Sequence, residues 1–150
     1  MTSNYELLQM AKKKHIRNLH VLCKDELETL SFGANKNIIV NLSSSTDEDN
    51  GSHWCALFVN RHSQCFYFDP FGIVPPKAVM SFCKKKRVCF SETQVQDLSS
   101  SKCGFFCIAF LSYMNTDDRV PDHESIKNFL LKFNNDDTRE NDVILKKHFF

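Results

Sequence analysis

Cys103 opens a run, residues 103–111, that is apolar on nearly every side and follows a polar lead of serines and a lysine. A helix that is apolar all round is buried, so the run predicts a central buried helix that begins at Cys103. Helix N-termini favour negative charge and lower cysteine pKa values, and Gly104 leaves the sulfur uncrowded on its far side. These features suit a nucleophile. The alternative is a small core residue, because free cysteines are usually buried.

A histidine and a carboxylate are expected to meet at the end of a predicted hairpin. Residues 53–59 and 64–69 have the composition of two strands joined by a turn. His53 begins the first strand and Asp69 ends the second, so antiparallel pairing places them side by side. His53 then offers a base for Cys103, and Asp69 a group that orients its imidazole. The structural alternatives are a histidine that only begins a strand and an aspartate that only forms a turn before proline.

A fourth role falls to Gln96, seven residues before Cys103 on the loop that leads into its helix. Its side-chain amide, together with the Cys103 backbone N–H, is a candidate donor to the oxyanion of a tetrahedral intermediate. Gln94 is a competing candidate that the spacing ranks lower. A single loop glutamine usually has no such role, so the prediction depends on the joint occurrence of His, Asp, Gln and Cys in this order.

The elements that must position these residues predict one domain, residues 1–150, of the α+β class. We expect a small mixed or antiparallel sheet packed against helices, with the Cys103 helix buried at its centre. The predicted strands are residues 36–42, 53–59, 64–69 and 87–90, the last running toward 94–96. The predicted helices are residues 5–14, 77–86, 103 to about 115, 121 onward and 141–145, with a turn or short helix at 24–27.

Several elements carry finer predictions. Ser3 or Asn4 is expected to cap the first helix. Residues 43–52 are Ser, Thr, Asp, Glu, Asn and Gly almost throughout and predict a surface loop. The side chains predicted to be buried on three of the helices are Leu8 and Ala11, then Val79, Met80 and Phe82, then Ile126, Phe129, Leu130 and Phe133.

Composition limits the classes of function. A net charge of +1 over 150 residues argues against a strongly basic nucleic-acid binder. No apolar run approaches the roughly 20 residues that span a membrane, and the N-terminus does not resemble a signal peptide. We therefore expect an intracellular protein that is not secreted. The 7 cysteines are odd in number and lack closely spaced pairs, so we expect neither a disulfide framework nor a metal site.

Four segments, taken together, resemble the motifs of the adenovirus protease (adenain) family: Ser52-His53-Trp54, Phe68-Asp69-Pro70-Phe71-Gly72, Gln96 and Cys103-Gly104-Phe105-Phe106-Cys107. The order His, Asp or Glu, Gln, Cys also belongs to the wider clan that includes the SUMO-specific proteases, whereas papain-like enzymes run Cys before His. The tail, with Phe133-Asn134-Asn135 and Asn141-Asp142-Val143, is similar to the adenain-like proteases of Polinton/Maverick elements and related DNA viruses. Two departures are an Asp where adenovirus enzymes carry Glu and a shorter C-terminal region.

The resemblance implies a cysteine endopeptidase that processes capsid or other structural precursor proteins of a virus or virus-like transposon, at sites that include Gly-Gly. The catalytic residues that it implies are Cys103 as nucleophile, His53 as general base and acid, Asp69 as its partner and Gln96 in the oxyanion hole. Trp54 would pack beside the imidazole and shield it, with Gly104 in support. A monomer acting in the host nucleus or the assembling virion is expected. The alternatives are a SUMO-type or ubiquitin-like deconjugating isopeptidase and, third, a non-catalytic binding module of the same fold.

No cofactor is expected for the chemistry itself. The adenovirus relatives are activated by a short capsid peptide and by DNA, so the resemblance makes both candidates here. Residues 84–87 form a basic run that suits a weak DNA contact, with a solvated helix end as the alternative. Cys83 and Cys89 are the nearest candidates for the cysteine that receives the activating peptide.

Overall fold

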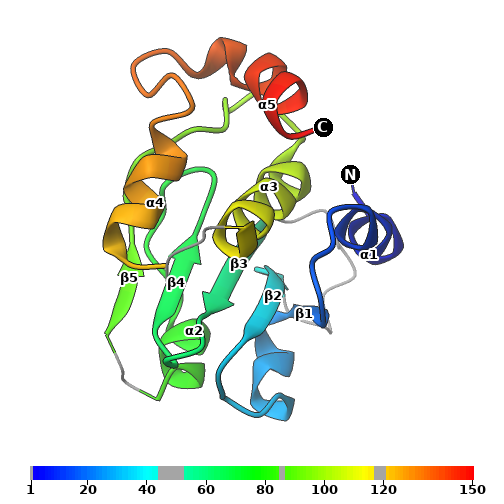
Figure 1. The fold of residues 1–150 in the computed structure, drawn as a ribbon, viewed down its shortest axis with the longest axis vertical. Coiled ribbons are helices and arrows are strands. Elements are labelled where there is room, and N and C mark those ends of the chain that lie inside the picture. Colours follow the sequence, from blue (N-terminus) through cyan, green and yellow to red (C-terminus); the bar gives the residue numbers. More distant parts are fainter. Residues whose placement is uncertain (1, 44–52, 85–86, 117–120) are drawn as a thin grey trace.

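The computed structural model describes residues 2–43, 53–84, 87–116 and 121–150. It has an α+β architecture in which a five-stranded sheet, in the order β1-β2-β3-β4-β5, carries helices on both faces (Figure 1). The strands are β1 Leu19–Cys23, β2 Lys36–Asn41, β3 Trp54–Val59, β4 Cys65–Phe68 and β5 Val88–Phe90. The helices are α1 Asn4–Lys13, η1 Lys24–Thr29, α2 Lys77–Phe82, α3 Cys103–Thr116, α4 His123–Leu130, η2 Thr138–Glu140 and α5 Asn141–Phe149.

The sheet is mixed. β3 pairs antiparallel with β2 and with β4, whereas the outer pairs β1–β2 and β4–β5 are parallel. The sequence analysis did not predict β1, since all five of its residues are only half-buried and the stretch lacks a clear alternation. The strand is held by its pairing with β2, a partner that lies beyond η1 in the sequence.

β3 lies at the centre of the sheet and is buried on both sides along its whole length. Alternate side chains of a strand point to opposite faces, and here they enter two separate cores. Trp54, Ala56 and Phe58 enter the core on the side of α1, α3, α4 and α5. Cys55, Leu57 and Val59 enter the core on the side of η1 and α2. Burial on both faces explains why β3 has a continuous apolar run rather than an alternating one.

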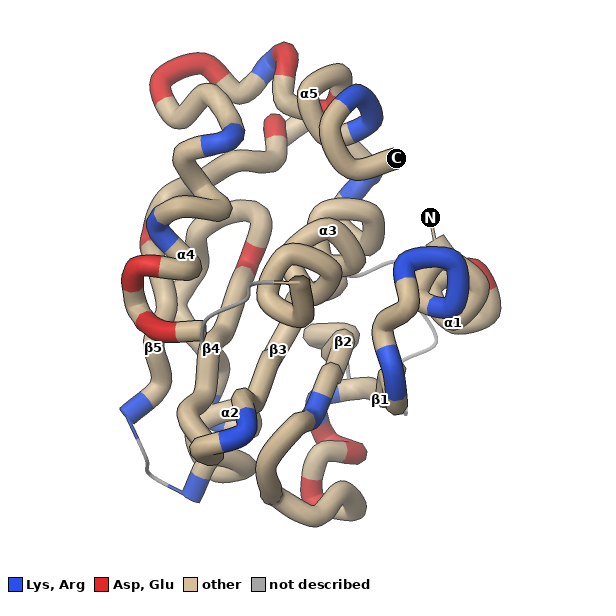
Figure 2. The backbone as a smooth tube through the Cα atoms, in the orientation of Figure 1, with Lys and Arg blue, Asp and Glu red and all other residues tan. Residues whose placement is uncertain are grey.

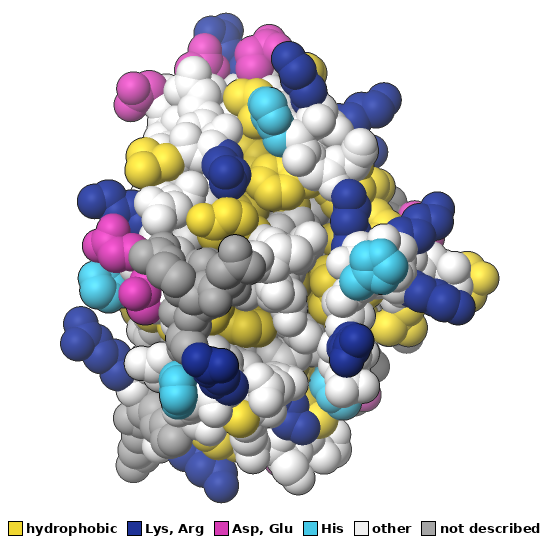
Figure 3. Space-filling view, in the orientation of Figure 1, with side chains coloured by type: hydrophobic (Ala, Val, Ile, Leu, Met, Phe, Trp, Pro, Cys, Tyr) yellow, Lys and Arg dark blue, Asp and Glu magenta, His cyan; other side chains and the backbone are white. Residues whose placement is uncertain are grey.

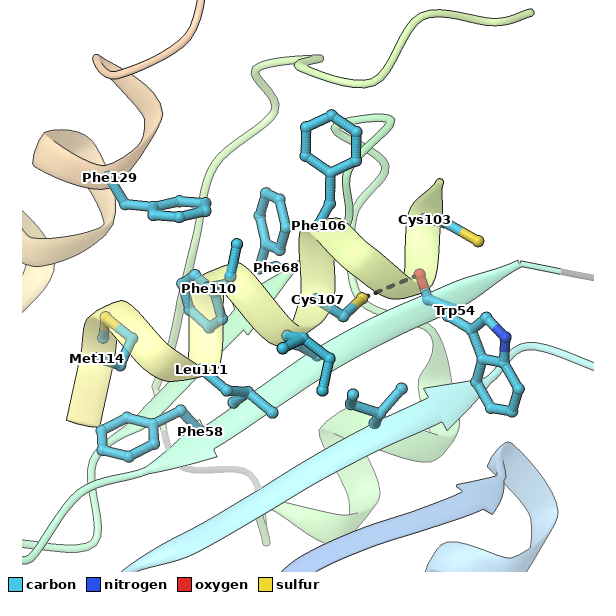
Figure 4. Close-up of a cluster of buried hydrophobic side chains, with 14 of the residues drawn as sticks. Trp54, Phe58, Phe68, Cys103, Phe106, Cys107, Phe110, Leu111, Met114 and Phe129 are labelled. Carbon is cyan, nitrogen blue, oxygen red and sulfur yellow. Dashed lines mark hydrogen bonds between the residues drawn. The ribbon is translucent and has the colours of Figure 1, made fainter. Parts of the chain in front are cut away.

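α3 packs against β3, with apolar contacts around the helix (Figure 4). Phe110 stacks on Phe68 of β4 with 4.9 Å between ring centroids, and Phe129 of α4 meets both rings edge-on. Such aromatic pairs contribute about 0.5–1.5 kcal/mol each beyond their buried area. The prediction of a central buried helix that begins at Cys103 is confirmed, so the helix carrying the thiol has a fixed position.

The first helix is capped as predicted, because the Ser3 side chain accepts a hydrogen bond from the Glu6 backbone N–H. Its predicted buried face was wrong by one residue. Leu7 and Ala11, one helical turn apart, face α3, whereas Leu8 is exposed. The i, i+4 pair forms one stripe along the helix, and Leu8 lies outside it.

Other boundaries also differ from the sequence prediction. α2 ends at Phe82, and Met80, which we expected to be buried, is exposed at the surface while Val79 and Phe82 are buried. α5 extends to Phe149 rather than ending near residue 145. The side chains predicted to be buried along α4 are buried, but the helix ends at Leu130, so Phe133 is buried beyond its end; Asp122 caps the helix. Most of the predicted loop 43–52 and residues 85–86 of the basic run lie outside the described residues.

Among the described helices, none combines the length and the apolar composition needed to cross a membrane.

Gly72 lets the loop after β4 approach the chain that leads toward α3. Its φ is +75°, in the left-handed region that favours glycine. A Cβ at this position would lie 2.6 Å from the Glu92 carbonyl oxygen and 2.8 Å from the Thr93 carbonyl carbon, both backbone atoms with little freedom to move. The loop beyond Asp69 therefore requires glycine here.

We expect Gly72→Ala to lower the free energy of unfolding by about 2 kcal/mol or more, because the left-handed backbone and the clash add up. Urea unfolding monitored by circular dichroism measures this change. Gly33→Ala is the matched control, since a Cβ at Gly33 would have no heavy atom within 4 Å and its effect should stay within about 0.5 kcal/mol. Equal effects of the two substitutions would contradict the close packing of this loop.

Candidate active site

His53 and Asp69 meet at the end of the β3–β4 hairpin, as the sequence predicted. The pairing of Ala56 with Phe68 fixes the register and sets the two ends side by side. His53 Nε2 lies 2.6 Å from Asp69 Oδ1, the Asp69 side chain is fully buried, and the His53 side chain is 16% exposed. A short bond to a carboxylate in a buried site fixes which edge of the imidazole faces inward.

Phe71 is a second constraint on His53, and the sequence analysis did not assign it a role. Its ring stacks on the imidazole with centroids 4.5 Å apart and an interplanar angle of 27°. The Phe71 backbone N–H also donates to Asp69 Oδ1 over 2.8 Å. The loop after β4 thus holds both the carboxylate and one face of the imidazole. The motif position of Phe71, two residues beyond Asp69, is the signal that could have identified it.

Cys103 is the first residue of α3 and is only 8% exposed. Burial by itself raises the pKa of its thiol, but hydrogen bonds from the His53 side chain and from the backbone N–H groups of Trp54 and Gly104 outweigh burial and lower the pKa below its ordinary value. In the opposite sense, burial alone lowers the pKa of His53, while hydrogen bonds with Asp69 and then Cys103 raise it far above its ordinary value. Both directions favour a thiolate beside an imidazolium.

Trp54 supports the site through its backbone and its indole. Its carbonyl accepts a hydrogen bond from the Cys107 thiol over 3.4 Å, one helical turn beyond Cys103 (Figure 4). Its indole Nε1–H donates to the Thr2 carbonyl over 3.1 Å. We expected Trp54 to shield the imidazole, but the ring that stacks on His53 is Phe71. Trp54 instead joins β3, α3 and the N-terminal segment.

Gly104 allows this N-terminal segment to come close. A Cβ there would lie 2.9 Å from Leu7 Cδ2 and 3.2 Å from Thr2 Cβ. We expected Gly104 to leave the sulfur of Cys103 uncrowded. The close contacts at Gly104 are with the N-terminal segment, and the effect of Gly104 on the sulfur of Cys103 stays a prediction.

Gln96 is buried on the loop before α3, but its amide is partly engaged. Its Nε2 donates to the Ser100 carbonyl over 3.0 Å and, more weakly, to Ser100 Oγ over 3.5 Å, whereas its Oε1 has no hydrogen-bond partner among the described residues. Gln94 is half-buried, and its Nε2 donates to the Gln96 carbonyl over 2.9 Å. The structure therefore brings His53, Asp69 and Cys103 together directly and places Gln96 on the segment that feeds Cys103.

Cys55 and Tyr67 lie behind the His53–Asp69 pair on the opposite face of β3 and β4 from α3, and the sequence analysis assigned neither a role. Burial raises the pKa of the Cys55 thiol to about 11. The Tyr67 hydroxyl and Asp69 Oδ2 have no hydrogen-bond partner among the described residues. Cys55 and Asp69 come directly next to the paired residues Ala56 and Phe68 in the sequence. Only the strand register therefore predicts that Cys55 and Asp69 are neighbours.

Ligand-type atoms of His53, Cys55 and Asp69 all lie within 4.8 Å of one another. This is the one such group among the described residues. In it, His53 Nε2 and Asp69 Oδ1 already share a 2.6 Å bond, which is shorter than the separation of two ligands on one zinc ion bound at about 2.0–2.1 Å in tetrahedral geometry. The cluster as it stands is a hydrogen-bonded pair with a neighbouring thiol.

Three hollows in the described surface do not include His53 or Cys103. One of about 910 Å³, between the start of α3 and α5, is bordered by Lys102 and Phe105. Another, of about 630 Å³, lies between η1 and α2, and a third, of about 870 Å³, lies beside β5. The bonding pattern, rather than the volume of a hollow, identifies the candidate site.

The chain matches no protein-family model, and a search of the curated proteins finds no similar one.

Selective alkylation tests the electrostatics of the site. We expect limiting iodoacetamide to label Cys103 first, and its rate to rise with pH at a lower midpoint than for an ordinary thiol, because the pKa of Cys103 is lowered. His53→Ala removes the main hydrogen-bond partner, so the midpoint should move to higher pH. Mass spectrometry of tryptic peptides over a range of pH measures both effects.

Cys107 is the internal control, since its thiol is fully buried and burial raises its pKa. Labelling of Cys107 as fast as Cys103 would contradict the thiolate–imidazolium pair. So would a pH profile of Cys103 labelling that His53→Ala leaves unchanged.

Proposed function

We propose that this chain is a cysteine endopeptidase with Cys103 as its nucleophile. The observation that carries the proposal is the buried 2.6 Å bond between His53 and Asp69 beside a thiol of lowered pKa. A thiolate, an imidazole and an orienting carboxylate are the combination that nucleophilic acyl transfer requires. The α+β architecture and the chain order of these residues also support an adenain- or SUMO-protease-like fold for the domain.

In the proposed reaction, Cys103 Sγ attacks the carbonyl carbon of the scissile peptide bond. The oxyanion that forms accepts hydrogen bonds from the Gln96 amide and the Cys103 backbone N–H, one of the helix N-terminal donors that lack an intrahelical partner. The His53 imidazolium then protonates the leaving amine as the tetrahedral intermediate collapses to a thioester. His53 next removes a proton from a water molecule, which hydrolyses the thioester and restores the Cys103 thiolate.

The proposed substrates are capsid or other structural precursor proteins of a virus or virus-like transposon, an assignment that rests on the family resemblance. Within the same clan, the alternative is a deconjugase that cleaves after the Gly-Gly tail of a ubiquitin-like protein. The chemistry at Cys103 is the same for both, so only the substrate distinguishes them. We further propose that the protein acts in the host nucleus or the assembling virion.

Activation by a peptide or by DNA stays a prediction. In the described residues, basic side chains lie on the last turns of α1 and α5, which are near one another beside the two termini (Figure 2). On the face shown in Figure 3, Lys and Arg side chains are scattered over the surface rather than gathered in one patch. On this face, such scattered charges suit a weak contact with phosphates.

The purified chain should cleave one of two substrate panels: capsid precursor proteins, or a SUMO or ubiquitin conjugate. We expect cleavage of the precursors, offered with and without capsid-derived peptide and DNA, and its loss in Cys103→Ala. Gln96→Ala should lower kcat by about 10²–10³-fold, the usual cost of one oxyanion donor.

Gln94→Ala is the matched control for Gln96→Ala, and it should change kcat little because its amide only supports the loop. If Gln94→Ala loses activity and Gln96→Ala does not, the oxyanion role belongs to Gln94. Cleavage of the conjugate alone would favour the deconjugase, and full activity of Cys103→Ala would refute the proposal.

A further inference from the structure

The loop between β5 and α3 carries Gln96 and ends at Cys103, and its first part is tied to the loop after β4. The backbone N–H groups of Val95 and Gln96 both donate to the Pro70 carbonyl over 2.9 Å. Pro70 follows Asp69 directly. The position of the Gln96 backbone is therefore linked to the carboxylate that orients His53.

Asn141, the first residue of α5, is completely buried and fixes the same loop from the other side. Its Nδ2 donates to the Val95 carbonyl and to the Asn134 carbonyl, each over 2.7 Å. Its Oδ1 accepts a hydrogen bond from the Asn134 backbone N–H over 2.9 Å. The side-chain amide thus makes three hydrogen bonds, one of them to the residue that precedes Gln96.

Asp142 continues this contact at the second residue of α5. Its Oδ1 accepts a hydrogen bond from Ser100 Oγ over 2.8 Å, and Ser100 Oγ accepts one from the Lys102 backbone N–H over 3.1 Å. The Ser100 carbonyl is the acceptor for the Gln96 amide. Ser100 therefore connects Asp142 both to Gln96 and to the residue immediately before Cys103.

α5 is itself anchored, so it can act as a fixed support. Leu145 is buried in the core on the α3 side of the sheet. Phe149 stacks on Phe133 with an interplanar angle of 14° and packs on Phe129 of α4. η2 is also joined to the loop between β5 and α3, because Thr138 Oγ1 donates to Asp97 Oδ1 over 2.8 Å.

We propose that Asn141 and Asp142 are positioning residues for the active site, acting through Val95 and Ser100 on the Gln96 amide and on the start of α3. The inference rests on the proposed function, because it assigns Gln96 an active role. It gives a purpose to the Asn141-Asp142 pair of the C-terminal segment, whose residues do not touch the His53–Asp69 pair in the described bonds. The reacting atoms would be held by a segment about forty residues further along the chain.

Kinetics distinguish positioning from a general contribution to stability. We expect Asp142→Ala and Ser100→Ala each to lower kcat by about tenfold, the effect of one hydrogen bond to a charged group, with KM nearly unchanged. The double variant should be no worse than Ser100→Ala alone, because Ser100→Ala already removes the bond to Asp142 together with the bond from the Lys102 N–H. Iodoacetamide labelling of Cys103 should keep its rate, since alkylation forms no oxyanion.

Glu140→Ala is the matched control. Glu140 is the N-cap residue of α5, and its side chain makes no capping hydrogen bond. The substitution therefore removes an acidic side chain from the same end of the helix and should leave kcat unchanged. Asp142→Asn keeps an acceptor oxygen and should recover most of the lost kcat. Equal kcat for Asp142→Ala, Glu140→Ala and the unsubstituted chain would overturn the proposal.

Hydrogen exchange provides a readout that needs no activity. Asp142→Ala should increase amide exchange over residues 97–102, whereas Glu140→Ala should not. If the unsubstituted chain cleaves neither substrate panel, the proposed function fails, and this measurement still decides whether α5 restrains the loop. Unchanged exchange in Asp142→Ala would overturn the restraint itself. Increased exchange with an unchanged kcat would overturn the positioning role.

Discussion

The buried hydrogen bond between His53 and Asp69 is the interaction on which the candidate site depends. It joins the start of β3 to the end of β4 and orients the imidazole toward Cys103. Taking charged groups out of water is costly, and good geometry with further hydrogen bonds must offset that cost. The Phe71 N–H on Asp69 and the backbone N–H groups on Cys103 supply such bonds. The polar site is stable because these donors are backbone groups held in place by the surrounding fold.

The rest of the fold supplies that rigidity from two directions. The apolar packing of α3 against β3 fixes where the thiol lies (Figure 4). In the loop that enters α3, Val95 is buried in the same core, and hydrogen bonds with Pro70, Asn141 and Asp142 hold the more polar residues around it. Hydrogen bonds are directional, so they can fix the orientation of an amide such as that of Gln96, which apolar contacts alone would leave free to turn.

The sequence predicts those parts of the structure that depend on local patterns. The all-round apolar run predicts α3, and the hairpin pattern predicts that His53 meets Asp69, because antiparallel geometry leaves little choice. It does not predict β1, whose half-buried residues are held by a parallel partner that lies beyond η1. The stacking of Phe71 and the contacts of Asn141 with Val95 depend on tertiary placement across loops. Leu7 rather than Leu8 faces α3 because the packing of the two helices selects one stripe from an ambiguous pattern.

The protonation state of His53 is the most direct test of the central claim. Nitrogen-15 NMR of the imidazole at about pH 8, where an ordinary histidine has lost its second proton, reports whether both ring nitrogens carry hydrogen. A thiolate–imidazolium pair predicts two protonated nitrogens in the unsubstituted chain, since the bonds with Asp69 and Cys103 raise the pKa of His53. A neutral imidazole that titrates near the ordinary histidine pKa would contradict it.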